Sequence, residues 1–398
     1  MRKKMTRPRT TAAIALLLAG STALTACGGT ASEPAATKAG RATGPTARPV
    51  ADPVVTTYDG GLYVLDGTTL KLAEDIPLSG FNRVNPAGDD RHVMVSTATG
   101  FRVMDAVGGR LTDVEFKGAK PGHVVRHAGR TVLFADGTGE VTVFDPKDLG
   151  DTEPATETYT SASAHHGVAI QLADGELVTT LGTEEKRVGI TVLDKKRAEI
   201  TRSEECPGVH GEATARDEAV VIGCENGVLI YRDGAITKVK SPDAYGRIGN
   251  QAGSDASPVV LGDYKKDKDA ELERPEQVSL IDTVTGKLRL VGLGTSYTFR
   301  SLARGPHGEA LVLGTDGRIH VIDPTTGKVT KRIPVLGAWQ EPLDWQQPRP
   351  ALFVRDTTAY VSDPAHKKLF AIDLASGERS AAVTLPKAVN EVSGVKAH

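Results

Sequence analysis

The sequence has few aromatic residues, no excess of positive charge and no recognisable catalytic pair, and each shortage argues against a class of function. Aromatic residues make up 5% of the 398 residues, which gives little support for a stacking platform that would hold a sugar or a quinone. The formal net charge is −2, whereas a surface that binds nucleic acid needs an excess of Lys and Arg. No nucleophile with a neighbouring base is apparent, so we do not expect an enzyme.

The first 26 residues lack acidic side chains and have the composition of an export signal. Five basic residues precede or flank the start of an apolar run at 12–18, and small residues then lead to Leu24-Thr25-Ala26-Cys27. The run is too short to form a stable membrane span, and the order is typical of a secretory signal. Because Leu-x-Ala-Cys resembles a bacterial lipobox, we predict a lipoprotein signal peptide at 1–26 and a lipid on Cys27. The alternative is a plain signal peptide with a chance cysteine.

The next segment, 27–52, is rich in Ala, Thr, Gly and Pro and contains almost nothing that a core could bury. It is expected to be a flexible, lipid-anchored tether. Loss of residues 1–26 leaves 43 Lys and Arg against 50 Asp and Glu, a formal charge of −7. We therefore expect a folded domain at 53–398, outside the cytoplasm on the outer face of the cell membrane, with no nucleic acid as partner.

With Cys27 assigned to the lipid, two cysteines remain, Cys206 and Cys224. In an exported chain a single remaining pair predicts a disulfide. The two cysteines enclose 17 residues, for which the chain-entropy model gives about 3 kcal/mol of stabilisation. A metal site that contains cysteine is the alternative, but the spacing is not that of a zinc knuckle.

A short apolar strand that ends in an aspartate recurs eight times along the chain. The aspartates are Asp66, Asp105, Asp145, Asp194, Asp233, Asp282, Asp323 and Asp373. Successive copies are 39 to 50 residues apart, a period typical of a β-propeller with one four-stranded blade per repeat. Each carboxylate is expected to accept hydrogen bonds from backbone N–H groups of the following turn. The fold class predicted is therefore all-β, an eight-bladed β-propeller.

The two ends of the repeat array predict how the ring closes. The first copy begins at its second strand, 54–58, and no innermost strand precedes it. A surplus strand is expected at the other end, at 389–395. If this C-terminal segment supplies the innermost strand of blade one, the ring closes without open sheet edges.

Histidines stand where the innermost strands of three neighbouring blades begin, around one mouth of the channel. Blade three has His123, blade four has His165 and His166, and blade five has His210 followed by Glu212. Zinc prefers such donors, at about 2.0–2.2 Å from N or O. We predict a metal site formed by His166, His210 and His123, with Glu212 or His165 as a fourth or alternate ligand. The predicted disulfide would brace the loop that carries His210.

This site prediction depends on placement alone, since ten histidines in 398 residues is no enrichment. The alternative is that these histidines are polar side chains that line a water-filled channel and bind no metal. If they do bind a metal, an imidazole site also accepts copper or nickel. Other innermost strands are expected to begin at 82–83, 247–248, 299–300 and 390–391. The histidines expected at the surface, away from the mouth, are His92, His127, His307, His320 and His366. His398, the last residue, is assigned no role.

Four segments together resemble the AztD-type zinc metallochaperones, which are exported propeller proteins that work beside a zinc ABC transporter. They are Tyr58 to Asp66, Gly80 to Gly88, His165-His166-Gly167-Val168-Ala169, and Cys206 to Ala213. The resemblance covers essentially the whole chain after the signal, and its most specific elements are His-His-Gly and Cys-x-x-x-His-Gly-Glu. It implies a zinc-binding metallochaperone that hands zinc directly to the transporter's solute-binding protein. Some relatives carry a histidine-rich segment near the N-terminus, whereas residues 28–53 of this chain contain no histidine.

We expect the chain to be a monomer. Two other functions compete with the metallochaperone interpretation. A metal-independent propeller lipoprotein that acts as a protein-binding scaffold would contain no bound metal after purification. An enzyme such as a propeller lactonase would usually set several carboxylates and an asparagine around a calcium ion, whereas the strand starts of this chain favour histidine.

Overall fold

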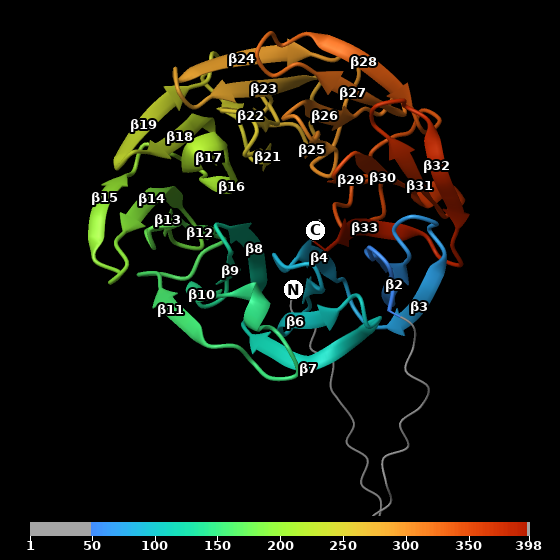
Figure 1. The fold of residues 1–398 in the computed structure, drawn as a ribbon. Helices are drawn as coiled ribbons and strands as arrows, with labels where there is room; N and C mark the ends of the chain where they lie inside the picture. Colours follow the sequence, from blue (N-terminus) through green and yellow to red (C-terminus); the bar gives the residue numbers. More distant parts are fainter. Residues whose placement is uncertain (1–48, 396–398) are drawn as a thin grey trace, which may run out of the picture. The chain divides into compact units, whose positions relative to one another are not determined.

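Residues 49–395 are described by a computed structural model, in which eight sheets surround a central channel (Figure 1); seven have four strands, and the fifth carries one additional short strand. The four main strands of each sheet are antiparallel to their neighbours, and the strand nearest the channel is followed outward by the other three. The predicted eight-bladed β-propeller is thus confirmed. The predicted signal peptide, Cys27 and most of the predicted tether lie outside the described residues.

Blades one to four each contain four strands, ordered from the channel outward. They are β33 (Val389–Gly394), β1 (Val54–Tyr58), β2 (Gly61–Leu65) and β3 (Leu72–Pro77); β4 (Arg83–Pro86), β5 (His92–Ser96), β6 (Gly100–Asp105) and β7 (Arg110–Lys117); β8 (Pro121–His127), β9 (Arg130–Ala135), β10 (Glu140–Phe144) and β11 (Thr156–Thr160); and β12 (Ala169–Gln171), β13 (Leu177–Gly182), β14 (Arg187–Leu193) and β15 (Glu199–Ser203).

Blades five to eight follow in the same order. They are β16 (His210–Thr214), β17 (Val220–Cys224), β18 (Asn226–Arg232) and β19 (Ala235–Lys240); β21 (Gln251–Ala252), β22 (Val259–Gly262), β23 (Gln277–Asp282) and β24 (Lys287–Gly292); β25 (Leu302–Arg304), β26 (Ala310–Leu313), β27 (Arg318–Ile322) and β28 (Val329–Pro334); and β29 (Leu352–Arg355), β30 (Thr358–Asp363), β31 (Lys368–Asp373) and β32 (Arg379–Thr384). Short 3₁₀ turns occur at η1 (Pro146–Asp148), η2 (Arg216–Glu218) and η3 (Pro364–His366).

Burial along the strands follows their distance from the channel. Middle strands such as β2, β5 and β17 are buried at every position, because a neighbouring blade covers each of their faces. Rim strands such as β24 and β28 alternate between exposed and covered side chains, as expected where successive side chains point to opposite faces and one face meets water. The apolar runs that identified the repeats are therefore strands buried on both sides.

The repeated aspartates close turns in seven of the eight blades. In blade one, for example, Asp66 accepts hydrogen bonds from the backbone N–H groups of Thr68 and Thr69, and equivalent bonds form at Asp105, Asp145, Asp194, Asp282, Asp323 and Asp373. The prediction was wrong for Asp233. This residue lies inside a two-residue hairpin with Gly234, at φ of 49° and 78°, so this turn needs left-handed backbone instead of a side-chain acceptor.

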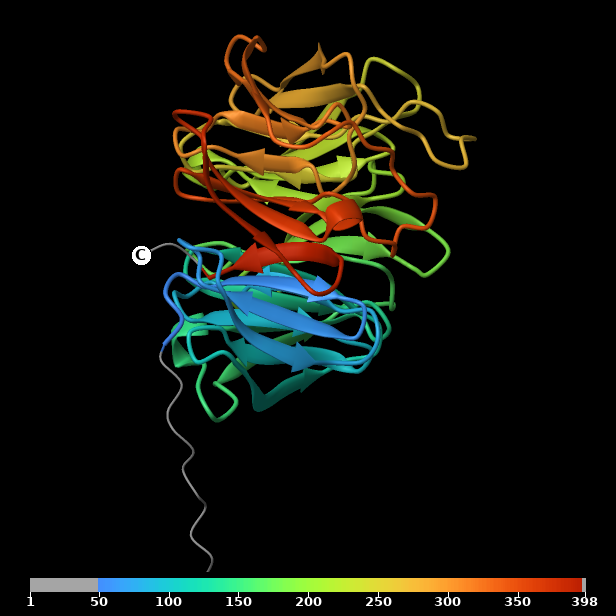
Figure 2. The same ribbon diagram turned by 90° about the vertical axis from the view of Figure 1, so that its right-hand side faces the viewer.

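The C-terminal strand β33 completes blade one as predicted, pairing antiparallel with β1. Figure 2 shows it beside the blue strands of that blade. An apolar cluster that includes Leu65, Leu369 and Val389 packs blade eight against blade one. The closing strand also carries Glu391, 7% exposed, whose carboxylate accepts hydrogen bonds from Arg83 of blade two and Arg300 of the loop before blade seven.

Blade six departs from the predicted strand starts. The segment expected to begin its innermost strand, 247–248, lies instead beside blade five, where β20 (Gly246–Arg247) pairs in parallel with β18. The innermost strand of blade six is the short β21. The intervening Gly249 and Asn250 are therefore left as a connecting loop at the channel mouth.

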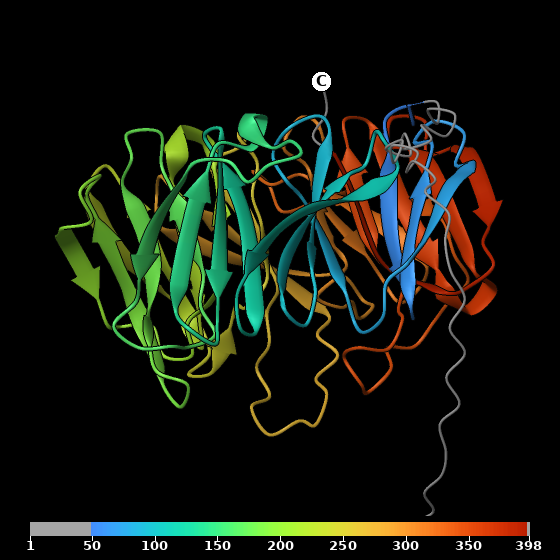
Figure 3. The same ribbon diagram turned by 90° about the horizontal axis from the view of Figure 1, so that it is seen from below.

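The two faces of the propeller differ in their loops. We define the start face as the face at which the innermost strands begin; the loops 263–276 and 335–351 belong to it, because they follow a second and a fourth strand. Figure 3 shows long yellow and orange loops projecting from one face. The described chain begins on the opposite face, where Val50 N–H donates to the carbonyl of Val107 after β6. Among the described residues, no helix is long and apolar enough to span a membrane.

Deletion of residues 389–398 should open the ring, because it removes β33, which is the partner of β1. It also removes the buried carboxylate of Glu391, which bonds Arg83 of blade two and Arg300 before blade seven. We expect a loss of several kcal/mol in the free energy of unfolding, since leaving Arg300 buried without its charge partner alone costs about 3–5 kcal/mol. Urea unfolding measures this loss, and a synthetic peptide of residues 389–395 should restore part of it. An unchanged unfolding midpoint would contradict closure by β33.

Candidate metal site

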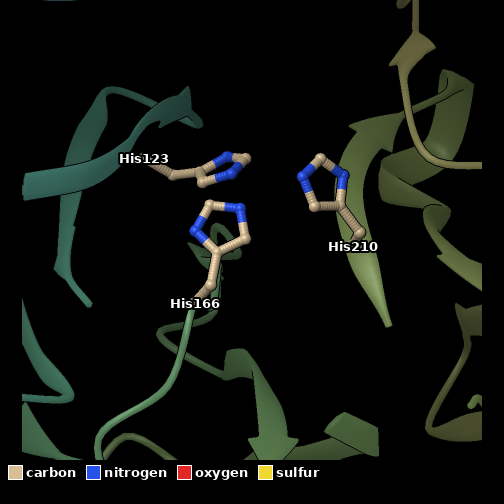
Figure 4. Close-up of side chains that lie close together, drawn as sticks. All are labelled: His123, His166 and His210. Carbon is tan, nitrogen blue, oxygen red and sulfur yellow. The ribbon is translucent and has the colours of Figure 1, made fainter. Parts of the chain in front are cut away.

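Three histidine side chains from adjacent blades converge at the start face. His123 comes from β8, His166 from the loop before β12, and His210 from the first position of β16. Their rings face one another in Figure 4, with centroids 5.0 to 5.7 Å apart. One ring nitrogen from each lies within 4.8 Å of the other two. The structure therefore brings together the three histidines that the sequence analysis grouped; that they bind a metal stays a prediction.

An oxygen atom lies against Nδ1 of each of these histidines. Nδ1 of His166 is 2.5 Å from the carboxylate of Asp136, and Nδ1 of His210 is 2.5 Å from the carbonyl oxygen of Gly249. Nδ1 of His123 is 3.5 Å from the carboxylate of Glu212. The longer contact of His123 is an ion-pair distance. In the two hydrogen bonds, at His166 and His210, the oxygen accepts, so Nδ1 donates and Nε2 is left with a free lone pair. Such hydrogen bonds to the far nitrogen are typical of metal-binding histidines.

Two glycine bulges orient the innermost strands at this site. Gly122 is the extra residue between Pro121 and His123 in the pairing of β8 with β9, and Gly211 is the extra residue between His210 and Glu212 in the pairing of β16 with β17. A bulge re-aims the side chains beside it, and bulges are frequent next to functional sites. Gly211 adopts φ of 72°, a conformation that favours glycine.

Gly122 also leaves the space that Asp136 occupies. A Cβ atom at position 122 would overlap the carboxylate of Asp136, which sits in the turn after β9 and also accepts a hydrogen bond of 3.3 Å from the backbone N–H of Gly167. The small residue before His123 is thus what allows a carboxylate from the same blade to reach His166 of the next blade.

The predicted disulfide is present and braces the His210 side of the site. Cys206 and Cys224 are fully buried, with their Cα atoms 4.9 Å apart. The carbonyl of Cys224 accepts from the N–H of Ile248, next to Gly249, and the carbonyl of Pro207 accepts from the N–H of Glu225. One covalent link therefore holds both the loop that leads to His210 and the segment that carries its hydrogen-bond acceptor.

The two candidate fourth ligands do not join the three nitrogens. The prediction for His165 was wrong in position: its side chain is 2% exposed, with Nδ1 against the carbonyl of Ser163 and Nε2 against the hydroxyl of Thr180, each at 2.9 Å. His165 instead anchors the loop that carries His166, and burial lowers its pKa. Glu212 lies beside the group but contacts Nδ1 of His123, so in this arrangement it supports a ligand.

Two of the five histidines expected at the surface are buried. His92 is 4% exposed and bonds Asp89, and His320 is 1% exposed and bonds Asp316. They lie inside strands β5 and β27, where a neighbouring blade covers them, and an aspartate nearby in sequence replaces the lost water contacts. His127 is partly buried against Glu218, whereas His307 and His366 are exposed as expected.

Electrostatics favour neutral imidazole at the innermost position of the group. Burial lowers the pKa of His210 well below its usual range, and the nearby His123, Arg247 and His166 add to this effect. A neutral ring is the form that binds a metal. The neighbouring carboxylates of Asp136 and Glu212 offset the positive charge that a divalent cation would bring.

The site geometry suits a small divalent metal with nitrogen ligands. Zinc holds imidazole nitrogens at about 2.0–2.1 Å in a tetrahedron, which places the nitrogens roughly 3.3–3.4 Å apart. The observed separations of up to 4.8 Å require the nitrogens to approach by up to about 1.5 Å. The side chain of His166 is 43% exposed, so this ring has room to rotate toward the other two.

Sequence reasoning missed Asp136 and the carbonyl of Gly249. Asp136 precedes Gly137 in a turn and looks like any other turn aspartate, although its position between the second and third strands places it on the start face, unlike the repeated aspartates. That topological difference was a usable signal. The role of Gly249 had none, because any residue has a carbonyl and only the loop between β20 and β21 aims this one.

Comparison with known proteins finds relatives of this architecture. No family model matches the chain. The zinc chaperone AztD of Citrobacter koseri is 23% identical over 286 residues, which are 69% of this chain and 66% of that protein. The match thus spans slightly less than two thirds of the curated relative's length.

Solved structures with the same fold include apo AztD from Citrobacter koseri, with a TM-score of 0.74 and 19% identity over 86% of this chain and 96% of that one. The dihydro-heme d1 dehydrogenase NirN in complex with DHE has a TM-score of 0.58 and 16% identity, over 90% of this chain and 78% of that one. These likenesses show the fold alone. A chaperone and a dehydrogenase share it, so function must be argued from the site.

Gly122→Ala should separate the histidine group from its supporting carboxylate. The added Cβ would displace Asp136 from His166, and loss of such a contact typically weakens metal binding by about 10–100-fold. Chelator competition measures the affinity. Gly150→Ala in the same blade is the matched control, because a Cβ there meets no atom within 4 Å. Equal affinity in both variants would contradict the role assigned to Asp136.

Proposed function

We propose that this chain is an extracytoplasmic zinc-binding metallochaperone and not an enzyme. The observation that carries the proposal is the His123, His166 and His210 group, in which an oxygen atom lies against each Nδ1 and one nitrogen of each ring lies near the other two. The sequence relationship to a protein named as a zinc chaperone supports zinc as the cargo. The three imidazoles argue for metal binding, and the relationship to a protein named as a chaperone is what favours a carrier over an enzyme.

The donor set fits zinc as a cargo that must also be released. Three imidazoles supply three of the four positions that zinc usually fills, and water can supply the fourth. Because the group lies at the mouth of the channel and His166 is half exposed, an incoming ligand from another protein can approach before the last bond breaks. A closed four-cysteine site would not allow this exchange.

The acceptor that we propose is the solute-binding protein of a zinc ABC transporter, docked on the start face. The loop 335–351 on this face presents Leu343 and Trp345, which are 62% and 53% exposed. Exposed Trp and Leu side chains on a rigid support are typical anchors of protein interfaces. The Trp345 ring packs edge-on against Phe81, with centroids 5.1 Å apart.

A buried arginine holds this loop in shape. Arg349 is 1% exposed; its guanidinium pairs with Glu341 at 2.6 Å and donates to the carbonyl of Asp344 at 2.6 Å. The buried Arg349–Glu341 pair costs desolvation energy, and the loop that it holds in place exposes the apolar side chains of Leu343 and Trp345. An ordered loop with an exposed apolar tip is what we expect of a surface that binds a partner protein.

Location outside the cytoplasm is supported by the signal-like N-terminus and by the buried disulfide, which an oxidising compartment maintains. We propose a lipid on Cys27 at the outer face of the cell membrane. The described chain begins on the face opposite the histidines, so a tether at this end leaves the start face open to an acceptor.

The double variant His166→Ala, His210→Ala should lose high-affinity zinc binding and keep its fold. Removing two of three nitrogen ligands should lower the affinity by more than about 100-fold, because even supporting contacts are worth about 10–100-fold. Zinc titration against a chelator measures this change, and circular dichroism verifies folding. The control His307→Ala, His366→Ala removes two exposed histidines. Unchanged zinc stoichiometry in the first variant would refute the site, and a wild-type protein that binds no zinc would favour the metal-independent scaffold.

Zinc affinity should fall as the pH drops from about 7 to about 5, because protons compete with zinc for imidazole. Because burial lowers the pKa of His210, this ring is less protonated near pH 6 than an exposed imidazole and has less of a second proton to lose. We therefore expect fewer protons released per zinc at about pH 6 than the roughly 2.3 that three imidazoles of ordinary pKa would release, measured by calorimetry in buffers of different ionisation enthalpy. Release of about 2.3 protons or more would contradict the lowered pKa of His210.

Leu343→Ala with Trp345→Ala should slow zinc transfer to the solute-binding protein by about tenfold, the loss expected when an interface anchor is truncated. The zinc affinity of the isolated chain should stay unchanged. Val284→Ala is the control, since Val284 is 60% exposed but follows β23 on the opposite face. Transfer at the wild-type rate would show that loop 335–351 is not the docking surface.

A further inference from the structure

The loop between β20 and β21 is held by a buried carboxylate that touches none of the three histidines. Asp263, directly after β22, is 2% exposed. One oxygen accepts hydrogen bonds from the backbone N–H groups of Gly249 and Asn250, at 2.6 and 3.1 Å. The other accepts from the side-chain amide of Asn250 at 2.8 Å, and the backbone N–H of Asp263 donates to the carbonyl of Asn250 at 2.9 Å.

These bonds fix the direction of one peptide group. The N–H groups of Gly249 and Asn250 are both turned toward Asp263, and the carbonyl of the peptide between them is turned toward Nδ1 of His210. In a planar trans peptide the N–H and C=O point in opposite directions. The hydrogen bond from the Asn250 N–H to Asp263 therefore keeps the Gly249 carbonyl pointed at Nδ1 of His210.

The backbone of blade five packs closely against this loop. Gly211 and Gly223 lie against the carbonyls of Gly249 and Ile248, so that a Cβ on either glycine would overlap them. The N–H of Ile248 is bonded to the carbonyl of Cys224 at 3.0 Å. The disulfide fixes the loop before Gly249 and Asp263 fixes the loop at Gly249, from blades five and six respectively.

We propose that Asp263 is a positioning residue for the metal site: through the Asn250 N–H and the Gly249 carbonyl, it holds His210 in the Nδ1–H tautomer with Nε2 free for the metal. The statement about the metal rests on the proposed function, whereas the statement about the tautomer does not. Asp263 belongs to blade six, which contributes no ligand, so four consecutive blades take part in the site.

The test compares Asp263→Ala with Asp263→Asn in the metal-free protein. Nitrogen NMR of the His210 ring should report a single Nδ1–H tautomer in the wild type and a mixture in Asp263→Ala. The asparagine carbonyl can still accept from both backbone N–H groups, and the Asn250 amide can turn to accept from the new amide, so Asp263→Asn should restore the single tautomer. A single Nδ1–H tautomer in Asp263→Ala would overturn the proposal.

A matched control variant distinguishes a specific effect on the metal site from a general loss of stability. Asp105, also 2% exposed and also a turn acceptor, lies in blade two. Asp105→Ala and Asp263→Ala should both lower the unfolding midpoint, but only Asp263→Ala should weaken zinc binding, by about tenfold. If Asp263→Ala does not fold, Asn250→Ala removes one of the three bonds to the carboxylate and should produce a smaller tautomer shift; no shift would count against the proposal.

The two claims can fail separately. A wild-type chain that binds no zinc, with a tautomer that responds to Asp263→Ala, would refute the proposed function and support the positioning role. Zinc binding that both Asp263→Ala and Asp105→Ala weaken equally, with no change of tautomer, would refute the positioning role and leave the chaperone function standing.

Discussion

The site depends on how blades three, four and five pack against one another. A single apolar cluster runs through these blades, from Val125 and Phe134 through Ile190 to Val220 and the half-cystines Cys206 and Cys224. Histidines on three separate strands can meet only if the strands keep a fixed spacing, and close packing supplies that spacing. Closure of the ring by β33 extends the same constraint to the whole propeller, since an open ring could widen between any two blades.

Around the three histidines, each supporting oxygen comes from a different kind of structure. Asp136 reaches His166 across a blade boundary because Gly122 leaves room for it; Glu212 lies on the same strand as His210 and contacts His123. The carbonyl of Gly249 depends on the turn that Asp263 holds. The ring nitrogens are thus oriented by neighbouring blades, while the exposed His166 leaves one side accessible. A site that is ordered by its neighbours and open on one side suits binding followed by release.

The sequence was sufficient for the fold, and for part of the site. Periodicity identified eight blades because the middle strands are buried on both faces, and the missing strand before Val54 predicted the closure by β33. It also placed His123, His166 and His210 together, since strand starts gather at one mouth. It failed where local chemistry overrides the repeat: His165 and His166 are adjacent in sequence, yet one faces the group and the other is buried against Thr180. Bulges, the displaced strand of blade six and backbone carbonyl acceptors leave no pattern that periodicity can detect.

X-ray absorption of the zinc-loaded chain tests the central claim most directly. After loading with one equivalent of zinc and removal of the excess with a weak chelator, the account predicts one tightly held zinc per chain, with three imidazole nitrogens at about 2.0–2.1 Å and a fourth light atom. Zinc retained with fewer than three imidazoles, or with sulfur ligands, would contradict the site, and a chain that retains no zinc would contradict the function.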